Sequence, residues 1–462
     1  MNLLTVLFEI LLLWRNAFKK AECFNRAVQH AVAGLCSGGR GTITQIITAL
    51  GRSNTDWTED YRLYAKRKWN AQSLFQPIIE KSLSFAHKDF IAIGVDDTKL
   101  RKTGKKIPKA SWQRDPMGPR FQTNLIWAQR FLQFSHLLPL YSQFENTPPR
   151  SLPISFTEAP SVKKPGRKAT EEDIKTYREA KKKWNLSVLF LQEAHRIRKM
   201  LDKAGAYALR ALLVADNGYC NQICFKAQLE RMNILARCRK DAQLCFRSEP
   251  GSKRFYAQEV FSPEELRQDA HILWQTTSIF HGGQWREIQY KEVPKVLWRR
   301  GAGRKTLRLF VIRPVKYRLT KKGKAYYRDP AYLLSTDLES KAQDQIQAYF
   351  DRWQIEVNHR EEKQIIGVGQ AQVRNEQSVH KQPALMVAAY SALLLASVLC
   401  YQDQGQSAQF EKAKWSGGMR RPSCRQLVIQ LRRELTKAPM PQNINGINID
   451  IAIENMLLKA VA

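Results

Sequence analysis

The chain has 462 residues, of which 75 are Lys or Arg and 42 are Asp or Glu, so its formal net charge is +33. Because a cationic surplus of this size repels itself, it indicates a polyanionic partner, either nucleic acid or an acidic membrane surface. A hydrophobic content of 44% excludes a disordered chain and supports two or three domains with buried cores. The eight cysteines contain no C-x-x-C pair, which argues against a disulfide scaffold or a zinc site, and we interpret them as reduced thiols.

Two apolar runs raise the question of a membrane protein. The first, residues 3–14, has no cationic segment before it and contains Glu9, which favours a buried helix over a signal peptide. The second, residues 383–400, barely reaches the length of a membrane span, and we expect it to form a core helix. We therefore predict a cytoplasmic protein with no membrane partner.

The N-terminal region predicts two short helices joined by a turn. Thr42 can cap the first helix and Gly51 can end it, and the second begins at Asp56 with a pattern like a capping box. This spacing fits a DNA-binding helix-turn-helix and an ordinary helical hairpin equally well. Arg62 and Lys66 favour the first alternative, because both lie on the second helix and can contact phosphate.

The first candidate carboxylate follows an apolar strand. Residues 90–95 (FIAIGV) predict a buried strand that ends at Asp96 and Asp97. Acidic residues at such a position either bond the local backbone in a turn or bind a metal at the rim of a sheet. The sequence leaves open which of the two aspartates would be the ligand. The Arg101 and Lys105 side chains that follow are candidate phosphate contacts.

The second candidate carboxylate repeats this pattern, because the apolar run 211–215 (ALLVA) stops at Asp216. Two strand-end aspartates upstream of Glu356 form a set of oxygen ligands of the kind that Mg²⁺ prefers. Between the two aspartates, residues 170–203 predict one long helix capped by Thr170.

Residues 231–338 read as a β-rich segment between Asp216 and Glu356. Trp298 lies there among clustered basic residues, where an aromatic ring can stack on an unpaired base. The alternative, that this ring fills a small β core, is the more common role of a tryptophan.

The stretch 349–363, YFDRWQIEVNHREEK, carries the most specific pattern in the chain. Tyr349, Arg352, Glu356 and Lys363 would fall within an arc of about 60° on one side of a helix. Taken alone, such a face is most often a solvated surface with internal ion pairs. Together with the upstream aspartates, it predicts a site in which the glutamate binds metal and the cations face phosphate.

This pattern resembles the Tyr-x2-Arg-x3-Glu-x6-Lys signature of bacterial insertion-sequence transposases, whose catalytic triads are Asp-Asp-Glu. Asp96-Asp97-Thr98 is similar to the first aspartate motif of that family, and VADNGY around Asp216 is similar to its second. The resemblance covers roughly residues 40–400 and implies an α/β fold, in which an RNase H-like mixed sheet is flanked by helices and interrupted by a β-rich insertion. The implied divisions are a helical DNA-binding region at 1–85, a catalytic core at 86–230 and 339–400, the insertion at 231–338 and a helical C-terminal region at 401–462.

The resemblance also implies residue roles. Asp96, Asp216 and Glu356 would be the catalytic residues and would hold two Mg²⁺ ions, for which Mn²⁺ would substitute. Tyr349, Arg352 and Lys363 would contact phosphate near a transposon end, and Trp298 would stack on a flipped base.

The implied activity is metal-dependent DNA cleavage and strand transfer, in cut-and-paste movement of an insertion sequence. The implied partner is double-stranded DNA, both the terminal inverted repeats and the target, bound by a homodimer at the bacterial nucleoid. Two alternatives stay open: a non-catalytic DNA-binding relative, such as a repressor or a domesticated copy, and an RNase H-like structure-selective nuclease.

Overall fold

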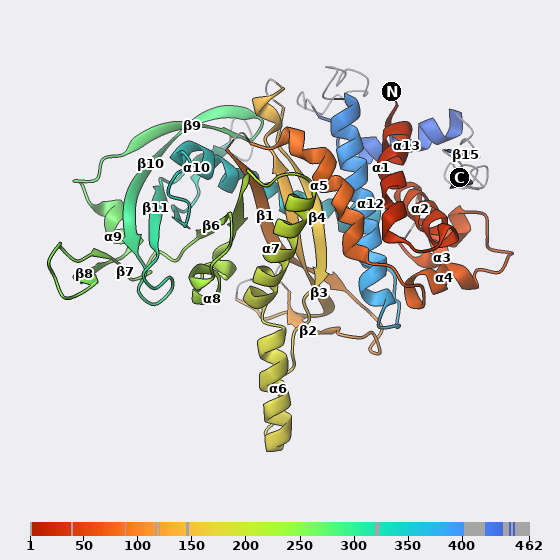
Figure 1. Ribbon diagram of the computed structural model, residues 1–462, viewed down its shortest axis with the longest axis horizontal. Helices are drawn as coiled ribbons and strands as arrows, with labels where there is room; N and C mark the ends of the chain where they lie inside the picture. Colours follow the sequence, from red (N-terminus) through yellow and green to blue (C-terminus); the bar gives the residue numbers. More distant parts are fainter. Residues whose placement is uncertain are drawn as a thin grey trace.

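The computed structural model describes residues 2–437 apart from 38–39, 88, 116–117, 120, 145–146, 319–322 and 402–420, together with two short strands, Asn443–Ile444 (β15) and Ile447–Asn448 (β16) (Figure 1). Much of the predicted helical C-terminal region, 401–462, therefore lies outside the described residues. The described part of that region contains the helix Cys424–Lys437 (α13). The described chain consists of one long mixed sheet with a helical layer on one face and the helices α10 (Ala342–Asp351) and α11 (Trp353–Glu361) against the other.

Helices from both ends of the chain pack together on one face of the sheet. The helix Ser378–Tyr401 (α12) runs through the middle of this layer (Figure 1). It is long and apolar enough to cross a membrane, but 94% of its apolar window is buried inside the protein. The buried helices predicted at residues 3–14 and 383–400 are confirmed. The layer also contains α1 (Leu3–Leu12), α2 (Ala21–Cys36), α3 (Ile43–Ala49), α4 (Thr58–Ala65), α5 (Gln76–Ser82) and α13.

The sheet has twelve strands. Its central strands are mixed: β1 is antiparallel to β3 and parallel to β5, β3 is antiparallel to β4, and β5 is parallel to β6. The order β4-β3-β1-β5-β6 is that of an RNase H-like core, which confirms the predicted fold class. The core strands are β1 (Phe90–Arg101), β2 (Ser111–Arg114), β3 (Leu125–Leu138), β4 (Arg150–Glu158), β5 (Arg210–Ala215) and β6 (Met232–Arg237).

The β-rich segment extends this sheet and does not form a separate one. β6 pairs with β14, and the order continues as β11-β10-β7-β8, with β9 paired to β10. A small hairpin of β12 and β13 stands apart from the sheet. The segment contains β7 (Leu244–Arg247), β8 (Tyr256–Phe261), β9 (Gln275–His281), β10 (Gln284–Leu297), β11 (Thr306–Ile312), β12 (Lys316–Arg318), β13 (Ala325–Tyr327) and β14 (Ala331–Ser335), with the short helices α8 (Gln222–Lys226) and α9 (Pro263–Gln268) nearby.

The prediction that the first strand ends at Asp96 is wrong. β1 continues through Asp96 and Asp97 to Arg101 because β3 pairs with it along that whole length. On its other side, β1 pairs with β5 only as far as Gly94, which is opposite Val214. Asp96 therefore lies within a strand that has lost one of its two neighbours, and its side chain can face an opening beside β5.

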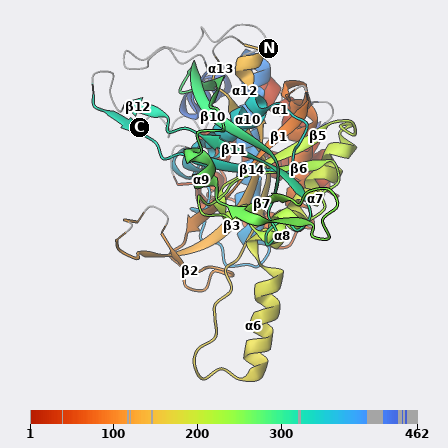
Figure 2. The same cartoon turned by 90° about the vertical axis from the view of Figure 1, so that its left-hand side faces the viewer.

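The long helix predicted at 170–203 is two helices. α6 (Glu171–Lys183) begins with a capping box between Thr170 and Asp173, as its acidic first turn suggests. The chain breaks at Asn185, whose side chain caps α7 (Leu186–Lys203) by accepting hydrogen bonds from the Ser187 and Val188 amides. α7 packs on the sheet, whereas α6 projects from the body of the protein and buries none of its residues (Figures 1 and 2).

The predicted N-terminal pair of helices is present as α3 and α4. Thr42 caps α3, and Gly51 follows it with a φ of +71°, as predicted. The second helix begins later than predicted, at Thr58, because the Asp56 carboxylate accepts a hydrogen bond from the Thr58 amide. The Arg62 guanidinium pairs with Glu59 of the same helix at 2.9 Å.

Candidate active site

The stretch 349–363 is a broken helix, so the prediction of one continuous helical face is wrong. α10 (Ala342–Asp351) ends before Arg352, α11 (Trp353–Glu361) begins after it, and a π-helical turn (Glu362–Ile366) follows. Lys363 lies in that turn, which changes its angular position relative to Glu356. A π-helical turn inside a helix is a frequent feature of functional sites.

Close packing between β1 and α11 sets the position of Glu356. A Cβ at Gly94 would come within 2.4 Å of the Ile355 Cδ1 atom, so the glycine lets the Ile355 side chain lie directly on the strand. Ile355 is fully buried and belongs to the same core cluster as Ala92 and Val214. Glu356, the next residue, is thereby fixed above the strand ends.

The alternation of side chains along β1 separates the two aspartates. Gly94 faces Ile355 of α11, and side chains two residues apart share a face, so Asp96 also faces α11. Asp97 faces the opposite side of the sheet, where the Arg130 charge lowers its pKa against the stronger effect of burial. Extending the pairing of Gly94 with Val214 by two residues brings Asp96 alongside Asp216.

The guanidinium of Arg352 lies between two of the candidate carboxylates. Its Nη1 atom is 3.8 Å from Oδ2 of Asp96, and its Nη2 atom is 3.5 Å from Oε1 of Glu356. Burial raises the pKa of Asp96, the His359 and Arg352 charges oppose that rise, and the Asp216 charge adds to it. Asp96 and Glu356 thus share one basic side chain, and Asp216 follows the strand that pairs with β1 beside Asp96.

Several buried polar atoms at this site have no hydrogen-bond partner among the described residues. They are the Tyr219 hydroxyl, Arg352 Nε, His359 Nε2 and Glu362 Oε1. Buried polar groups are normally paired, so a cluster of unpaired ones fits a site that a ligand completes. Together with the all-oxygen donor set of Asp96, Asp216 and Glu356, these atoms fit a divalent cation and a phosphodiester.

Tyr219 and His359 are functional candidates that the sequence did not reveal. Tyr219 is 1% exposed, and its pKa is raised well above the ordinary value by burial and by the charges of Asp97, Asp96 and Asp216. It therefore stays protonated and can donate a hydrogen bond to an aspartate. His359 follows Glu356 by three residues, so the helical period contained a signal for it.

Lys363 is also close to the aspartates. Burial lowers its pKa, and the Glu362, Asp96 and Asp97 charges raise it in part. The carboxylates therefore favour the charged form of this lysine, which suits a residue expected to contact phosphate.

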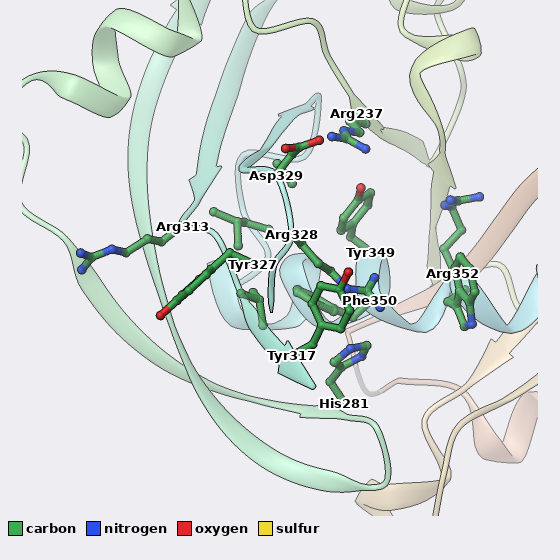
Figure 3. A pocket seen from close by; sticks show the side chains of 14 residues that line it. Arg237, His281, Arg313, Tyr317, Tyr327, Arg328, Asp329, Tyr349, Phe350 and Arg352 are labelled. Atoms are coloured by element: carbon green, nitrogen blue, oxygen red, sulfur yellow. The ribbon is translucent and has the colours of Figure 1, made fainter. Parts of the chain in front are cut away.

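Two basic cavities adjoin the carboxylates. One, of about 520 Å³, is lined by Tyr349 and Arg352 together with Arg237, Arg328 and aromatic side chains (Figure 3). The second, of about 710 Å³, contains Asn217, the neighbour of Asp216, and shares Arg237 with the first. Both cavities would offer cations, with Arg237 in common, to a chain of phosphates passing beside Asp96 and Asp216.

The remaining predicted DNA contacts lie in different places. The Arg101 guanidinium is mostly exposed and pairs with Asp115 at 2.6 Å, and Lys105 is exposed in the loop after β1. Arg62 and Lys66 are exposed on and just after α4 in the helical layer. The Trp298 ring packs edge-on against Phe225 with 5.7 Å between ring centroids and covers Gly301, so its observed contacts are those of a core side chain.

A second group of potential metal ligands lies near the start of β1. Ligand atoms of His87, Asp89 and Asp344 all lie within 4.8 Å of one another. The group includes an exposed aspartate, and the His87 ring lies 3.3 Å from the Asp344 carboxylate. Exposed acidic groups of this kind are common without a metal, and this one contains none of the predicted catalytic residues.

No curated protein matches the sequence significantly. Among solved structures, the chain is similar to a piggyBac transposase in a synaptic complex with hairpin DNA, at 11% sequence identity and a TM-score of 0.34, over 87% of this chain and 62% of that one. The family model of the DDE superfamily endonucleases matches residues 18–304, which include Asp96 and Asp216 but end before Glu356. Because this match extends over more than half of the sequence, the chain belongs to the DDE superfamily endonucleases.

Proposed function

We propose that this endonuclease is the transposase of a bacterial insertion sequence. It would bind the terminal inverted repeats of its element as a homodimer on double-stranded DNA, cut the strands and join them to a target, in the cytoplasm at the nucleoid. The observation that carries the proposal is the position of Arg352, 3.8 Å from Asp96 and 3.5 Å from Glu356, with Asp216 on the neighbouring strand. That arrangement unites the transposase signature of 349–363 with the two aspartates.

Asp96, Asp216 and Glu356 would hold two Mg²⁺ ions, with Mn²⁺ as a substitute. When bound, such ions stabilise negative charge on the attacking and leaving oxygens of an in-line phosphoryl transfer. Asp96 is a better candidate for this role than Asp97, because Asp96 lies on the face of β1 that α11 covers. The Tyr219 hydroxyl, which is buried and has no partner among the described residues, would donate a hydrogen bond to an aspartate or to the bound phosphate.

The basic residues would act on the DNA itself. Arg352 and Lys363 would neutralise the phosphate beside the carboxylates, and the buried, unpaired Nε of Arg352 supplies a further donor. Tyr349 lines the adjoining cavity, and its hydroxyl would donate a hydrogen bond to a neighbouring phosphate. Trp298 would stabilise the fold in preference to stacking on a base, since its ring lies against Phe225.

The test is strand cleavage by the Glu356→Gln variant. Duplexes carrying the DNA that flanks the gene would be incubated with wild-type protein and variant in Mg²⁺, and cleavage and binding measured in parallel. We expect the variant to lose cleavage and keep duplex binding, while Glu172→Gln on the exposed helix α6 behaves as wild type.

Other outcomes separate the alternatives. Undiminished cleavage by Glu356→Gln would remove that residue from the catalytic set. Wild-type protein that binds these ends but never nicks them would be a non-catalytic relative. Nicking without strand transfer into a supercoiled plasmid would indicate a nuclease.

A further inference from the structure

A third basic cavity, a groove, lies away from the carboxylates, toward the β8 edge of the sheet. It has a volume of about 780 Å³ and is bordered by β7, β8 and the turn between β10 and β11. Its lining contains no acidic residue and includes the arginines Arg254, Arg299, Arg300 and Arg304. We call it the β8 groove.

Aromatic rings contact two arginines of the β8 groove, Arg299 and Arg304, and the nearby Arg247. The guanidinium groups of Arg247 and Arg304 lie 5.2 Å and 5.0 Å from the Phe255 ring centre, and that of Arg299 lies 5.5 Å from the Tyr256 ring centre. These guanidinium groups form no ion pair with any described carboxylate. Their N–H groups therefore remain free for a ligand, and stacking on the rings reduces the entropy lost when they bind it.

The chemistry of the groove favours the phosphates of duplex DNA. Arginines without acidic neighbours attract a polyanion. Because arginines stack on Phe255 and Tyr256, these rings are less available to unpaired bases, which single-strand-binding surfaces require. Guanidinium groups that project from aromatic rings are suited to bidentate contacts with phosphate oxygens.

Basic surface also connects the β8 groove with the catalytic carboxylates. The cavity beside Asn217 contains four cations, Arg237, Arg239, Lys240 and Arg267, together with Glu264 and Asp329. Arg267 pairs with Glu264, and Arg239 pairs with Asp241. Residues 237–243 lead directly from that cavity to Gln243, which lines the groove. A DNA backbone that leaves Asp216 along this path would meet Arg237 and Lys240, which form no ion pair with a described carboxylate, before it reaches the groove.

The sheet provides a measure of the separation. From β5, which carries Asp216 at its end, the strand order to β8 contains six spacings. At about 4.8 Å for each, this is a path of roughly 29 Å along the sheet. Duplex DNA rises by about 3.4 Å per base pair, so the path corresponds to roughly nine base pairs.

We propose that the β8 groove is a second DNA-binding site, which holds the phosphate backbone of duplex DNA roughly nine or more base pairs from the cleaved bond. The identity of the polyanion rests on the proposed function. The groove fixes how far the DNA extends over the protein and contributes affinity without taking part in the chemistry.

The test compares two matched pairs of arginine substitutions. Arg299→Gln/Arg304→Gln removes two charges from the groove, and Arg425→Gln/Arg433→Gln removes two exposed charges from α13. Binding of a labelled 40-base-pair duplex and of a 40-nucleotide single strand would be measured by fluorescence anisotropy over a range of salt concentrations. If the first pair disturbs folding, Arg254→Gln/Arg300→Gln replaces it.

We expect the groove variant to bind the duplex at least about tenfold more weakly at 0.1 M salt, with a log–log salt slope smaller by roughly 2. The α13 variant should bind like wild type. The same duplex affinity and slope in all proteins would overturn the proposal, as would a loss confined to the single strand. A change in oligomeric state with unaltered duplex binding would also overturn it, and would show that the edge strand β8 pairs with a second copy.

Cleavage assays separate this proposal from the proposed function. If wild-type protein never cleaves DNA but the groove variant binds duplex more weakly, the groove stands and the transposase assignment fails. If Glu356→Gln loses cleavage but the groove variant binds normally, the groove fails and the transposase assignment stands.

Discussion

Gly94 of β1 lies directly beneath Ile355 of α11, so close that a Cβ atom at position 94 would come within 2.4 Å of the Ile355 Cδ1 atom. This contact fixes the helix that carries Glu356 against the strand that carries Asp96. The distance between the two carboxylates therefore depends on a residue that has no chemistry of its own.

Gly94→Ala should separate the carboxylates. Ile355 is fully buried, so its side chain or the helix that carries it must shift, at a cost of about 1–3 kcal/mol in stability. We expect cleavage to fall on the order of 100-fold, because small displacements in an active site are costly. Ile355→Val removes the Cδ1 atom, so the double variant should regain much of the activity in a cleavage assay, and failure to do so would contradict the contact as the cause.

Arg352 should compete with metal for Asp96 and Glu356. In Arg352→Gln, the two carboxylates lose the cation that lies 3.8 Å and 3.5 Å away from them, and Mn²⁺ binding to the DNA-free protein should become about tenfold tighter. DNA cleavage should nevertheless fall, because the phosphate loses its partner. Electron paramagnetic resonance would measure free Mn²⁺, with Arg360→Gln, exposed on the same helix, as the control. Weaker Mn²⁺ binding would instead make Arg352 a support for the metal site.

Asp96→Asn and Asp97→Asn should differ in their effect on metal-dependent cleavage. Asp96 faces α11 and Asp97 faces the other side of the sheet, so we expect the first substitution to abolish metal-dependent cleavage and the second to reduce it by less than about tenfold. Cleavage rates and Mn²⁺ binding of both variants would be compared at the same protein concentration. The reverse order of effects would assign the ligand to Asp97.

Asp351 should make the stability depend on pH. It is 4% exposed, accepts hydrogen bonds from Tyr141 at 2.6 Å and Gln347 at 2.9 Å, and burial raises its pKa to about 7 from an ordinary value of 3.8. Between these values the folded state binds more protons than the unfolded state. The free energy of unfolding therefore decreases as pH rises from about 4 to 7, by up to about 4 kcal/mol.

Asp351→Asn removes this dependence. The free energy of unfolding of the variant, relative to that of wild type, should increase from pH 4.5 to pH 8. Denaturant unfolding of both proteins at the two pH values would measure this difference. Parallel changes in the two proteins would mean that Asp351 is ionised in the folded state throughout this range.

Features that depend on near neighbours in the chain were predictable from the sequence. Thr42 begins α3, Gly51 follows its end, and the Thr170 capping box begins α6. Each of these boundaries depends on hydrogen bonds or dihedral angles within a few residues. The apolar run 211–215 gave the strand that ends at Asp216, and the two longer runs gave buried helices. The order of the carboxylates and the 349–363 spacing identified the candidate site.

Features that depend on pairing between distant segments were not predictable. β1 continues beyond Asp96 because β3 supplies hydrogen bonds there, and the sequence of residues 90–101 alone does not indicate that partner. The helix break at Arg352 likewise appears only in the fold.

The sequence by itself determined which residue types the site uses and in what order, because composition, spacing and local hydrogen bonding are written in neighbouring residues. Only the tertiary structure decided that Asp96 and not Asp97 faces Glu356, that Tyr219 and His359 join the site, and that Trp298 packs against Phe225. The physical reason is that the face on which a strand residue lies, and what covers that face, are set by the segments that pack against it from elsewhere in the chain.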